Sequence, residues 1–327
     1  MSPINNLELF LITYNRKEKC RQTLEAVLAE TSPVKNFPLT ILDNCSTDGT
    51  GQMLAEFAAR HPNIRLIRHE KNIGGNANIA SAFEMARAEY VWVLCDDDQY
   101  DFSSWRECEK ALSQNPPAVV VANYAHPQKG LAYLFRQLSF VPAAIYRTDL
   151  ITSDTLMNMY FSISNLFPQL AVAAAAINTG RPLPILDRPL VTMQLNPGND
   201  SYLRGTSNKS QMHPLIGKMF WSLGYLRSIQ MLHNQSIRRR CSNLAWAEED
   251  KSFYFFLHNW IMNTHKNFLA NYFEGIHLLH GVAKWKFMFL LPLTWIIFFY
   301  SDNKGLYICL FGRAKVRIWK YKELKTN

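Results

Sequence analysis

Three adjacent aspartates, Asp96, Asp97 and Asp98, stand directly after the apolar run Tyr90–Cys95. Neighbouring carboxylates repel one another, so a cation is expected to neutralise them. Mg²⁺ and Mn²⁺ prefer oxygen ligands, commonly one or two carboxylates together with phosphate oxygens. The triplet therefore predicts a divalent metal site at which a diphosphate leaving group is neutralised. The alternative is a solvated acidic turn that caps the next helix.

A second polar group follows the apolar run at 39–42, where Asp43 opens a turn that ends at Gly49. A carboxylate at this position can accept a hydrogen bond from the imide of a nucleobase. Thr13 and Tyr14 stand at the end of the first apolar run, which begins at Leu7, and are placed to flank such a base. Taken alone, Asp43 is equally well interpreted as an ordinary turn-forming aspartate.

The segment 72–78 reads Asn-Ile-Gly-Gly-Asn-Ala-Asn and precedes a helical pattern. Two glycines allow a ligand to approach the backbone closely, and the N-terminus of a helix offers amide groups to an anion. The segment is neither Gly-x-Gly-x-x-Gly nor a Walker loop, which argues against a dinucleotide oxidoreductase and a P-loop NTPase. Gly-Gly pairs also form ordinary turns.

The elements that position these groups alternate along the first half of the chain. The patterns predict strands at 7–13, 39–42, 64–68, 90–95 and 118–122, and helices at 17–30, 50–60, 78–88 and 104–113. Such alternation is typical of parallel βαβ units, so we expect an α/β fold with a mostly parallel sheet flanked by helices. Ligands bind beyond the carboxyl ends of the strands in such sheets, where all three polar groups are expected.

Composition limits the class of protein. The chain has 327 residues, of which 48% are hydrophobic and 19% charged, so it can form a packed core. Its net charge of +9 suits a polyanionic partner. Its six cysteines show neither a zinc-binding spacing nor a secreted disulfide framework, and no signal peptide is recognised. We therefore expect a cytoplasmic protein.

The second half of the chain has a different character. We expect a first domain at 1–205 and a helical, aromatic and basic C-terminal region at 206–327. The apolar stretch 287–300 is shorter than the roughly 20 residues needed to span a bilayer, and basic residues flank it. This pattern predicts peripheral docking on the anionic inner face of the cytoplasmic membrane, with a buried core helix as the alternative. Because the basic residues gather there, nucleic acid is not expected as a partner.

As an ordered set, four segments resemble the family-2 inverting glycosyltransferases of the GT-A fold. The segments are Thr13–Arg16, Asp43–Thr50, Asn72–Asn76 and Leu94–Asp98. The resemblance covers residues 7–123 and, more loosely, the chain to about residue 195. It implies a Rossmann-like domain that binds a nucleotide-diphosphate sugar and transfers the sugar, with inversion, to a hydroxyl of a glycan. The membrane-directed C-terminal region favours a polyprenyl-linked saccharide of a bacterial surface polysaccharide as the acceptor.

The same resemblance implies roles for individual residues. Asp96 and Asp98 match the Asp-x-Asp pattern that holds ribose and metal. The other residues expected to line the nucleotide-sugar pocket are Thr13, Tyr14, Asn15, Asp43, Asn72, Gly74, Gly75, Asn76 and Asp97. Independently of the resemblance, four arginines are candidates to meet phosphates of the donor or of a carrier, with a solvated surface position as the alternative for each: Arg16, Arg181, Arg188 and Arg204.

The sequence departs from the family in two places. The family often reads Asp-x-Asp-Asp here, and Cys95 replaces the first of these acids if the last two are aligned. Asp97 can therefore share the metal role, and which two of the three aspartates bind the metal stays open. Inversion also needs a carboxylate that deprotonates the acceptor hydroxyl, which many relatives supply from a Glu-Asp pair at the start of a helix. The corresponding helix is expected at 163–179, without an acidic pair. The nearest acids are Asp149, Asp154, Asp187 and Asp200. We assign the base to Asp154, for which a surface or capping role is the competing interpretation.

Two other classes of function stay open. A sugar nucleotidyltransferase would need a glycine-rich loop with Arg and Lys after the first strand, whereas Thr13–Arg16 contains no glycine. A catalytically degenerate nucleotide-sugar-binding or scaffold protein is compatible with the missing acidic pair. In the favoured interpretation, the loop at 196–201 closes over the donor and excludes water.

Overall fold

The computed structural model describes residues 6–122, 130–163, 167–194, 224–248, 273, 276–281, 284–285 and 288, and three strands within 297–320. The chain divides into two compact units, Met1–Gly205 and Thr206–Asn327.

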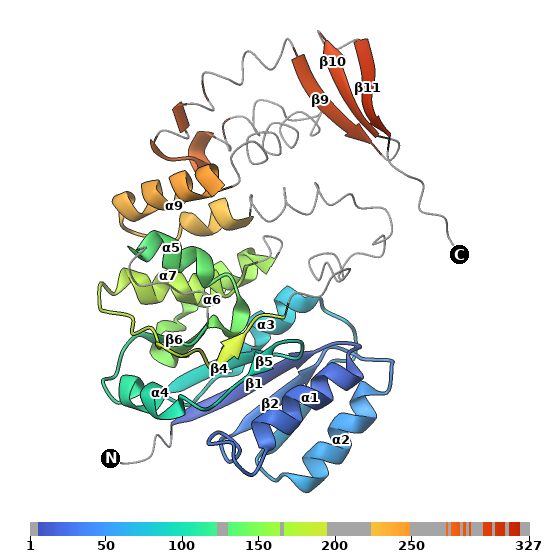
Figure 1. Cartoon of the computed structure of the whole chain (residues 1–327), viewed down its shortest axis with the longest axis vertical. Helices are drawn as coiled ribbons and strands as arrows, with labels where there is room; N and C mark the ends of the chain where they lie inside the picture. Colours follow the sequence, from blue (N-terminus) through green and yellow to red (C-terminus); the bar gives the residue numbers. More distant parts are fainter. Residues whose placement is uncertain are drawn as a thin grey trace. The chain divides into compact units, whose positions relative to one another are not determined.

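The first unit is built on a six-stranded sheet with the order β3-β2-β1-β4-β7-β6 (Figure 1). Its strands are β1 (Leu7–Thr13), β2 (Leu39–Asp43), β3 (Ile64–Arg68), β4 (Tyr90–Cys95), β6 (Ala118–Val120) and β7 (Ala144–Arg147). β1 pairs in parallel with β2 and β4, and β2 with β3. β7 is antiparallel to both β4 and β6. The mostly parallel sheet is thus confirmed, with an antiparallel edge that the sequence did not predict.

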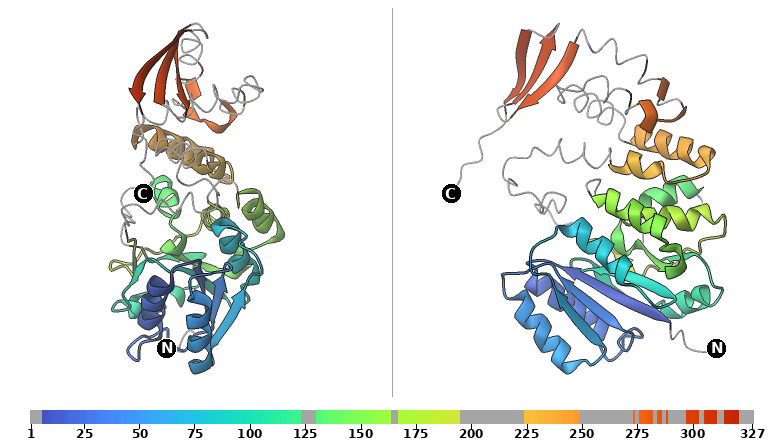
Figure 2. Two further views of the ribbon diagram at one scale, coloured as in Figure 1. Left: turned by 90° about the vertical axis from the view of Figure 1, so that its right-hand side faces the viewer. Right: turned by 180° about the vertical axis from the view of Figure 1, so that it is seen from behind.

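Helices cover both faces of this sheet (Figures 1 and 2). The helices of this unit are α1 (Lys17–Leu28), α2 (Thr50–Arg60), α3 (Gly75–Met85), α4 (Trp105–Leu112), α5 (Gly130–Gln137), α6 (Ser153–Phe161) and α7 (Leu170–Asn178). Right-handed connections from β1 to β2 to β3 place α1 and α2 on one face, while the return from β3 to β4 places α3 on the other. Accordingly α1 packs on α2, whereas α3 packs on β1, β4 and α6. The reversal falls between β1 and β4, which is where ligands bind in such sheets.

The central strands are almost wholly buried, as parallel strands covered on both faces must be. All five residues of β2 and the first five of β4 are buried. Trp92 is 0% exposed, and its Nε1 donates to the carbonyl of Pro142 at 2.9 Å, so its polar atom is satisfied. A small antiparallel pair, β5 (Gln99–Tyr100) with β8 (Val191–Thr192), follows the aspartate triplet.

The described part of the second unit contains both helix and sheet. α9 (Gln235–Glu248) agrees with the predicted helical region. The backbone at 297–320 does not, because β9 (Ile297–Asp302), β10 (Gly305–Leu310) and β11 (Ala314–Lys320) form an antiparallel sheet. Isoleucine and aromatic residues at 297–300 favour a strand, and the sequence Asp-Asn-Lys-Gly at 302–305 favours a hairpin turn. Among the described helices, none combines the length and the apolar character that a membrane span requires.

Candidate active site

The ends of β1, β2 and β4 meet at one edge of the sheet. Thr13 Oγ1, at the end of β1, donates to Asp96 Oδ2 at 2.6 Å. The backbone N–H of Asn44, just after β2, donates to the carbonyl of Thr13 at 3.0 Å. Asn44 Nδ2 also donates to Asn72 Oδ1 at 2.9 Å, which joins the glycine turn to the same edge. The polar groups predicted at the carboxyl ends of the strands therefore lie together.

Arg16 bridges the first two members of the triplet. Its Nη1 lies 2.7 Å from Asp96 Oδ1 and 2.6 Å from Asp97 Oδ2. Burial lowers the pKa of Arg16, but the charges of Asp96 and Asp97 raise it, so its pKa lies above the usual value and the guanidinium is charged. Burial also raises the pKa of Asp96, which Arg16 and Thr13 oppose. Both oxygens of Asp96 are thus engaged, one by Thr13 at the end of β1 and the other by Arg16 just after it.

Asp98 has a different environment. Its Oδ1 accepts a hydrogen bond from the backbone N–H of Gln194 at 3.3 Å, because β8 runs alongside β5 and ends beside the triplet. Burial, followed by the charge of Asp97, raises the pKa of Asp98 to about 7. Among the described residues, no group donates to the second oxygen of Asp98 or of Asp97. These two oxygens are the ones left for a ligand.

The donor set of the triplet fits a hard divalent cation. Mg²⁺ commonly takes one or two carboxylates from the protein and completes its coordination with phosphates and water. Because both oxygens of Asp96 are engaged, the geometry favours Asp97 over the predicted Asp96 as the second carboxylate beside Asp98. In the described part of the chain no three His, Cys, Asp or Glu side chains form a metal cage. The remaining ligands would therefore come from a bound diphosphate and water.

Tyr100, which was not predicted as a site residue, fixes the turn that carries the triplet. Its hydroxyl accepts from the backbone N–H of Cys95 at 2.9 Å and donates to the carbonyl of Cys95 at 3.1 Å. Its ring packs edge-on against Trp92 at a centroid distance of 5.8 Å. The signal in the sequence was an apolar residue two positions beyond the acids, where a solvated turn would be polar.

Asp43 lies at the end of β2 as predicted, but it is enclosed. It is 0% exposed, and its Oδ1 accepts from the backbone N–H of Ser46 at 3.0 Å. Arg68, its register partner on β3, has Nε at 3.4 Å from Oδ2 and donates through Nη2 to the carbonyl of Ser46. The Arg68 side chain is 55% exposed, so a nucleobase could reach Asp43 only if this guanidinium moved aside. Like Tyr100, Arg68 belongs to the site without having been predicted from the sequence.

The turns after β1 and β2 are fastened to each other. Asn15 and Cys45 both have left-handed backbones, with φ of 49° and 66°, a conformation that is uncommon away from glycine and gathers at functional sites. The backbone N–H of Asn15 donates to Ser46 Oγ at 2.9 Å, and Asn15 Oδ1 accepts from the N–H of Thr47 at 2.7 Å. Asn15, predicted to bind the donor, therefore shapes the turns, while Tyr14 beside it is partly exposed.

The glycine turn is shaped for close approach. Gly74 has φ of +86°, which strongly favours glycine, and Asn72 Oδ1 accepts from its N–H at 2.8 Å. A Cβ built at Gly74 or Gly75 would meet nothing within 4 Å, so the turn borders open space. No side chain caps α3, which leaves its first amide groups for an anion. Asn76, in the first turn, is engaged elsewhere, since its Nδ2 donates to the carbonyl of Ile163 at 2.7 Å.

The proposed base lies outside this cluster of contacts. Asp154 is exposed in the first turn of α6, where the N-cap Thr152 accepts from the N–H of Thr155. An acidic side chain is favourable at that position in any helix, so its role as base stays a prediction. The helix expected at 163–179 begins only at Leu170, after the buried Gln169, whose Nε2 donates to the carbonyl of Ser139.

The other sequence candidates are dispersed. Asp149 pairs with Arg147, Arg181 donates to the carbonyl of Asn115, and Asp187 and Arg188 are exposed. The loop at 196–201, with Asp200, and Arg204 lie outside the described residues.

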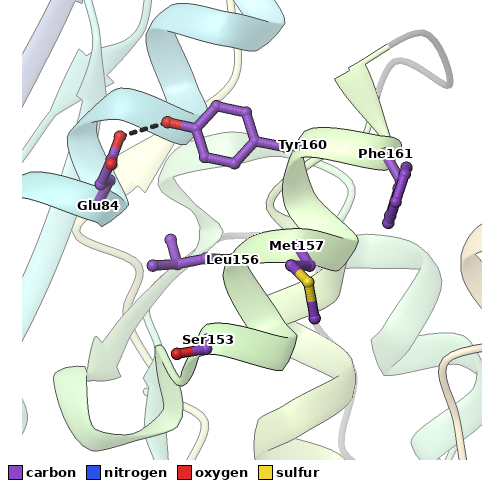
Figure 3. Close-up of a pocket in the computed structure, with 6 residues that line it drawn as sticks. All are labelled: Glu84, Ser153, Leu156, Met157, Tyr160 and Phe161. Carbon is purple, nitrogen blue, oxygen red and sulfur yellow. Dashed lines mark hydrogen bonds between the residues drawn. The ribbon is translucent and has the colours of Figure 1, made fainter.

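A shallow hollow of about 500 Å³ lies between α3 and α6 (Figure 3). Its lining residues are Glu84, Ser153, Leu156, Met157, Tyr160 and Phe161. The hydroxyl of Tyr160 donates to Glu84, so the acidic side chain of the hollow already has a hydrogen-bond partner. The hollow is largely apolar and contains none of the predicted site residues, so it is not the reactive centre.

The fold is that of an α/β protein of the GT-A type, and sequence comparison agrees. Residues 9–171 match glycosyl transferase family 2, and the chain belongs to that family. An uncharacterized protein of Mycobacterium tuberculosis is 30% identical over 49% of this chain and 45% of its own length. The poly(ribitol-phosphate) β-N-acetylglucosaminyltransferase TarP of Staphylococcus aureus is 25% identical over 48% of this chain and 46% of its own length. The matches thus span less than half of each relative.

Among solved structures, the mannosyltransferase PcManGT from Pyrobaculum calidifontis, in complex with GDP-Man and Mn²⁺, has a similar fold. The TM-score is 0.54 over 90% of this chain and 83% of that one, with 12% sequence identity. At this identity the likeness establishes the shared fold.

Proposed function

We propose that the chain is an inverting glycosyltransferase that moves a sugar from a nucleotide-diphosphate donor to a hydroxyl of a glycan acceptor, with Mg²⁺ or Mn²⁺. The observation that carries this proposal is the meeting of Thr13, Arg16 and the aspartate triplet at the carboxyl ends of β1 and β4. Membership of glycosyl transferase family 2 supports it. The GDP-Man and Mn²⁺ of the similar mannosyltransferase structure support the class of donor and cofactor.

The residues of the site would have separate roles. Asp97 and Asp98 would hold the metal ion, which neutralises the charge that develops on the diphosphate. The open Gly74 turn and the uncapped N-terminus of α3 provide amide donors for phosphate oxygens. Arg68, which contacts the enclosed Asp43, and Tyr14 would flank the nucleobase.

Transfer requires one bond to form as another breaks. The acceptor oxygen bonds to the anomeric carbon from the face opposite the donor oxygen, and the electron pair of the broken bond leaves with the diphosphate. The hydroxyl proton passes to a carboxylate, which we assign to Asp154. Attack from the opposite face inverts the configuration at the anomeric carbon.

We further propose a surface polysaccharide as the product, with a polyprenyl-linked saccharide as the acceptor. The named reaction of the relative TarP, on poly(ribitol-phosphate), supports a polymeric acceptor that carries free hydroxyl groups. Basic residues around 284–325 support peripheral binding to an anionic membrane. Co-sedimentation with vesicles containing phosphatidylglycerol, lost in high salt, tests the membrane proposal; equal sedimentation with neutral vesicles contradicts it.

A thermal-shift screen of nucleoside diphosphates with Mn²⁺ tests the main proposal. A ligand at 100 times its Kd stabilises the native state by about 2.7 kcal/mol, which corresponds to a rise in Tm of roughly 5–10 °C for a domain of this size. The matching nucleotide sugar should then be consumed with an acceptor, and Asp98→Ala should abolish transfer. Full turnover by Asp98→Ala would contradict the proposal.

A catalytically degenerate binding or scaffold protein is the second candidate. The observation that favours it is the neutral, buried Gln169 in front of α7, where many relatives have an acidic pair. Nucleotide binding in the thermal-shift screen, without turnover on any glycan acceptor, would support this candidate.

A further inference from the structure

Arg16 is placed unusually for a residue that only has to contact a donor. A single nitrogen, Nη1, contacts Asp96 at 2.7 Å and Asp97 at 2.6 Å. The Arg16 side chain is 14% exposed and that of Asp96 is 4% exposed, so the contact is largely shielded from water. Charge-assisted contacts in such surroundings are strong. In this structure Arg16 is therefore the cation of the triplet.

The contacts of Arg16 determine which oxygens a metal ion can use. If all three carboxylates are ionised they carry −3, and the guanidinium reduces this to −2. Arg16 and Thr13 engage both oxygens of Asp96, and Arg16 engages one of Asp97. In the absence of a donor, a divalent ion can bind only Asp98 and one oxygen of Asp97. The positive charge of Arg16 beside these groups repels the ion.

We propose that Arg16 is a positioning residue that makes metal binding depend on the donor diphosphate. Without a donor, Arg16 occupies carboxylate oxygens that a divalent ion would otherwise use, so the protein alone binds the ion weakly. A diphosphate supplies further oxygen ligands and negative charge, and it offers the guanidinium an alternative partner. The metal and the nucleotide therefore bind with positive coupling, and each raises the affinity of the other by the same factor.

The role of the donor in this inference depends on the proposed function, but the competition between Arg16 and the metal does not. The first experiment is therefore a titration of Mn²⁺ alone, followed by electron paramagnetic resonance of the free ion. Arg16→Gln removes the charge and releases oxygens of Asp96 and Asp97. Arg21→Gln, on α1, is the matched control. Arg21 pairs with Glu18, so this substitution makes the same change of charge away from the triplet.

We expect Arg16→Gln to bind Mn²⁺ alone at least about fivefold more tightly than the parent, which is the lower end of typical coupling factors. Arg21→Gln should match the parent. The titration is then repeated with saturating UDP or GDP. The nucleotide should raise the Mn²⁺ affinity of Arg16→Gln by a smaller factor than it raises the Mn²⁺ affinity of the parent. Parent-like or weaker binding of Mn²⁺ alone by folded Arg16→Gln would overturn the inference.

Arg16→Lys keeps the experiment decisive if Arg16→Gln does not fold, as judged by circular dichroism. The shorter lysine retains the charge but is expected to reach only one of the two carboxylates, so Mn²⁺ alone should bind more tightly than in the parent by a smaller factor. Parent-like affinity of Arg16→Lys would overturn the inference. If the parent binds neither nucleotide, the proposed function fails, while the comparison of Mn²⁺ alone still tests Arg16.

Discussion

Replacing Tyr100 with phenylalanine should loosen the turn that carries the three aspartates. The hydroxyl of Tyr100 bonds both the N–H and the carbonyl of Cys95, at 2.9 and 3.1 Å. The side chain is 8% exposed, and its ring packs between Trp92 and Phe102. Phenylalanine keeps these ring contacts, so the substitution isolates the effect of the hydroxyl group.

The size of the effect follows from the two backbone groups left without a partner. A buried polar group without a hydrogen bond costs about 1–3 kcal/mol, and water can replace part of the loss because Cys95 is only partly buried. We expect a total loss of about 1–3 kcal/mol, or a fall in Tm of roughly 3–10 °C. The relaxed turn should also raise the Mn²⁺ concentration for half-maximal transfer by about tenfold, because about 1.4 kcal/mol corresponds to a factor of ten.

Tyr90→Phe is the matched control, because Tyr90 begins the same strand, β4, at the end away from the triplet. Its buried hydroxyl donates to the carbonyl of Pro116 at 3.1 Å. Thermal unfolding should show a comparable loss for both variants, whereas Mn²⁺ titration of the transfer rate should show a change for Tyr100→Phe alone. A Tyr100→Phe protein with lowered Tm and the Mn²⁺ requirement of the parent would refute the positioning role.

Three further predictions concern pH, the glycine turn and the base. Burial raises the pKa of Asp98 from 3.8 to about 7, so between these pH values the folded chain binds more protons than the unfolded chain. The Tm of the metal-free protein should therefore fall as the pH rises through this window, and the fall should be smaller in Asp98→Asn. Gly74→Ala, at φ of +86°, should lower stability by about 1 kcal/mol in a urea titration, whereas Gly75→Ala, within a helix, should not. Asp154→Asn should lower kcat by about 100-fold or more with nucleotide binding unchanged, and parent-like kcat would exclude it as the base.

The strands that carry the site could be predicted because each is an apolar run that ends in a polar turn. β1, β3 and β4 begin and end at the predicted residues, and β2 extends by one residue to Asp43. The start of α3 was placed three residues late, at Asn78 instead of Gly75. Glycine is a poor helix former, and the buried Asn78, which donates to the carbonyl of Leu42, does not resemble a core residue.

The contacts that define the site could not be predicted, because they join residues far apart in the chain. Arg16 and Asp96 are 80 positions apart, and β7 lies between β4 and β6 in the sheet although it follows β6 in the chain. In the second unit, the apolar stretch 287–300 suggested a helix. The alternation of basic and apolar residues at 314–318 was the overlooked signal of a strand.

The neutral residue at position 95, where the family often has an aspartate, fits the charge balance of the site. Burial raises the pKa of the Cys95 thiol well above its usual value, and Asp98 and Asp97 add to the rise, so the thiol is neutral near pH 7. A carboxylate there would add a fourth negative charge beside the three that Arg16 partly neutralises. Tyr100 holds the turn through the backbone of Cys95, so the turn does not depend on an acidic side chain. Cys95 and Arg16 thus act in the same direction, because both lower the negative potential that attracts a metal ion to the protein alone and leave the donor diphosphate to supply the rest.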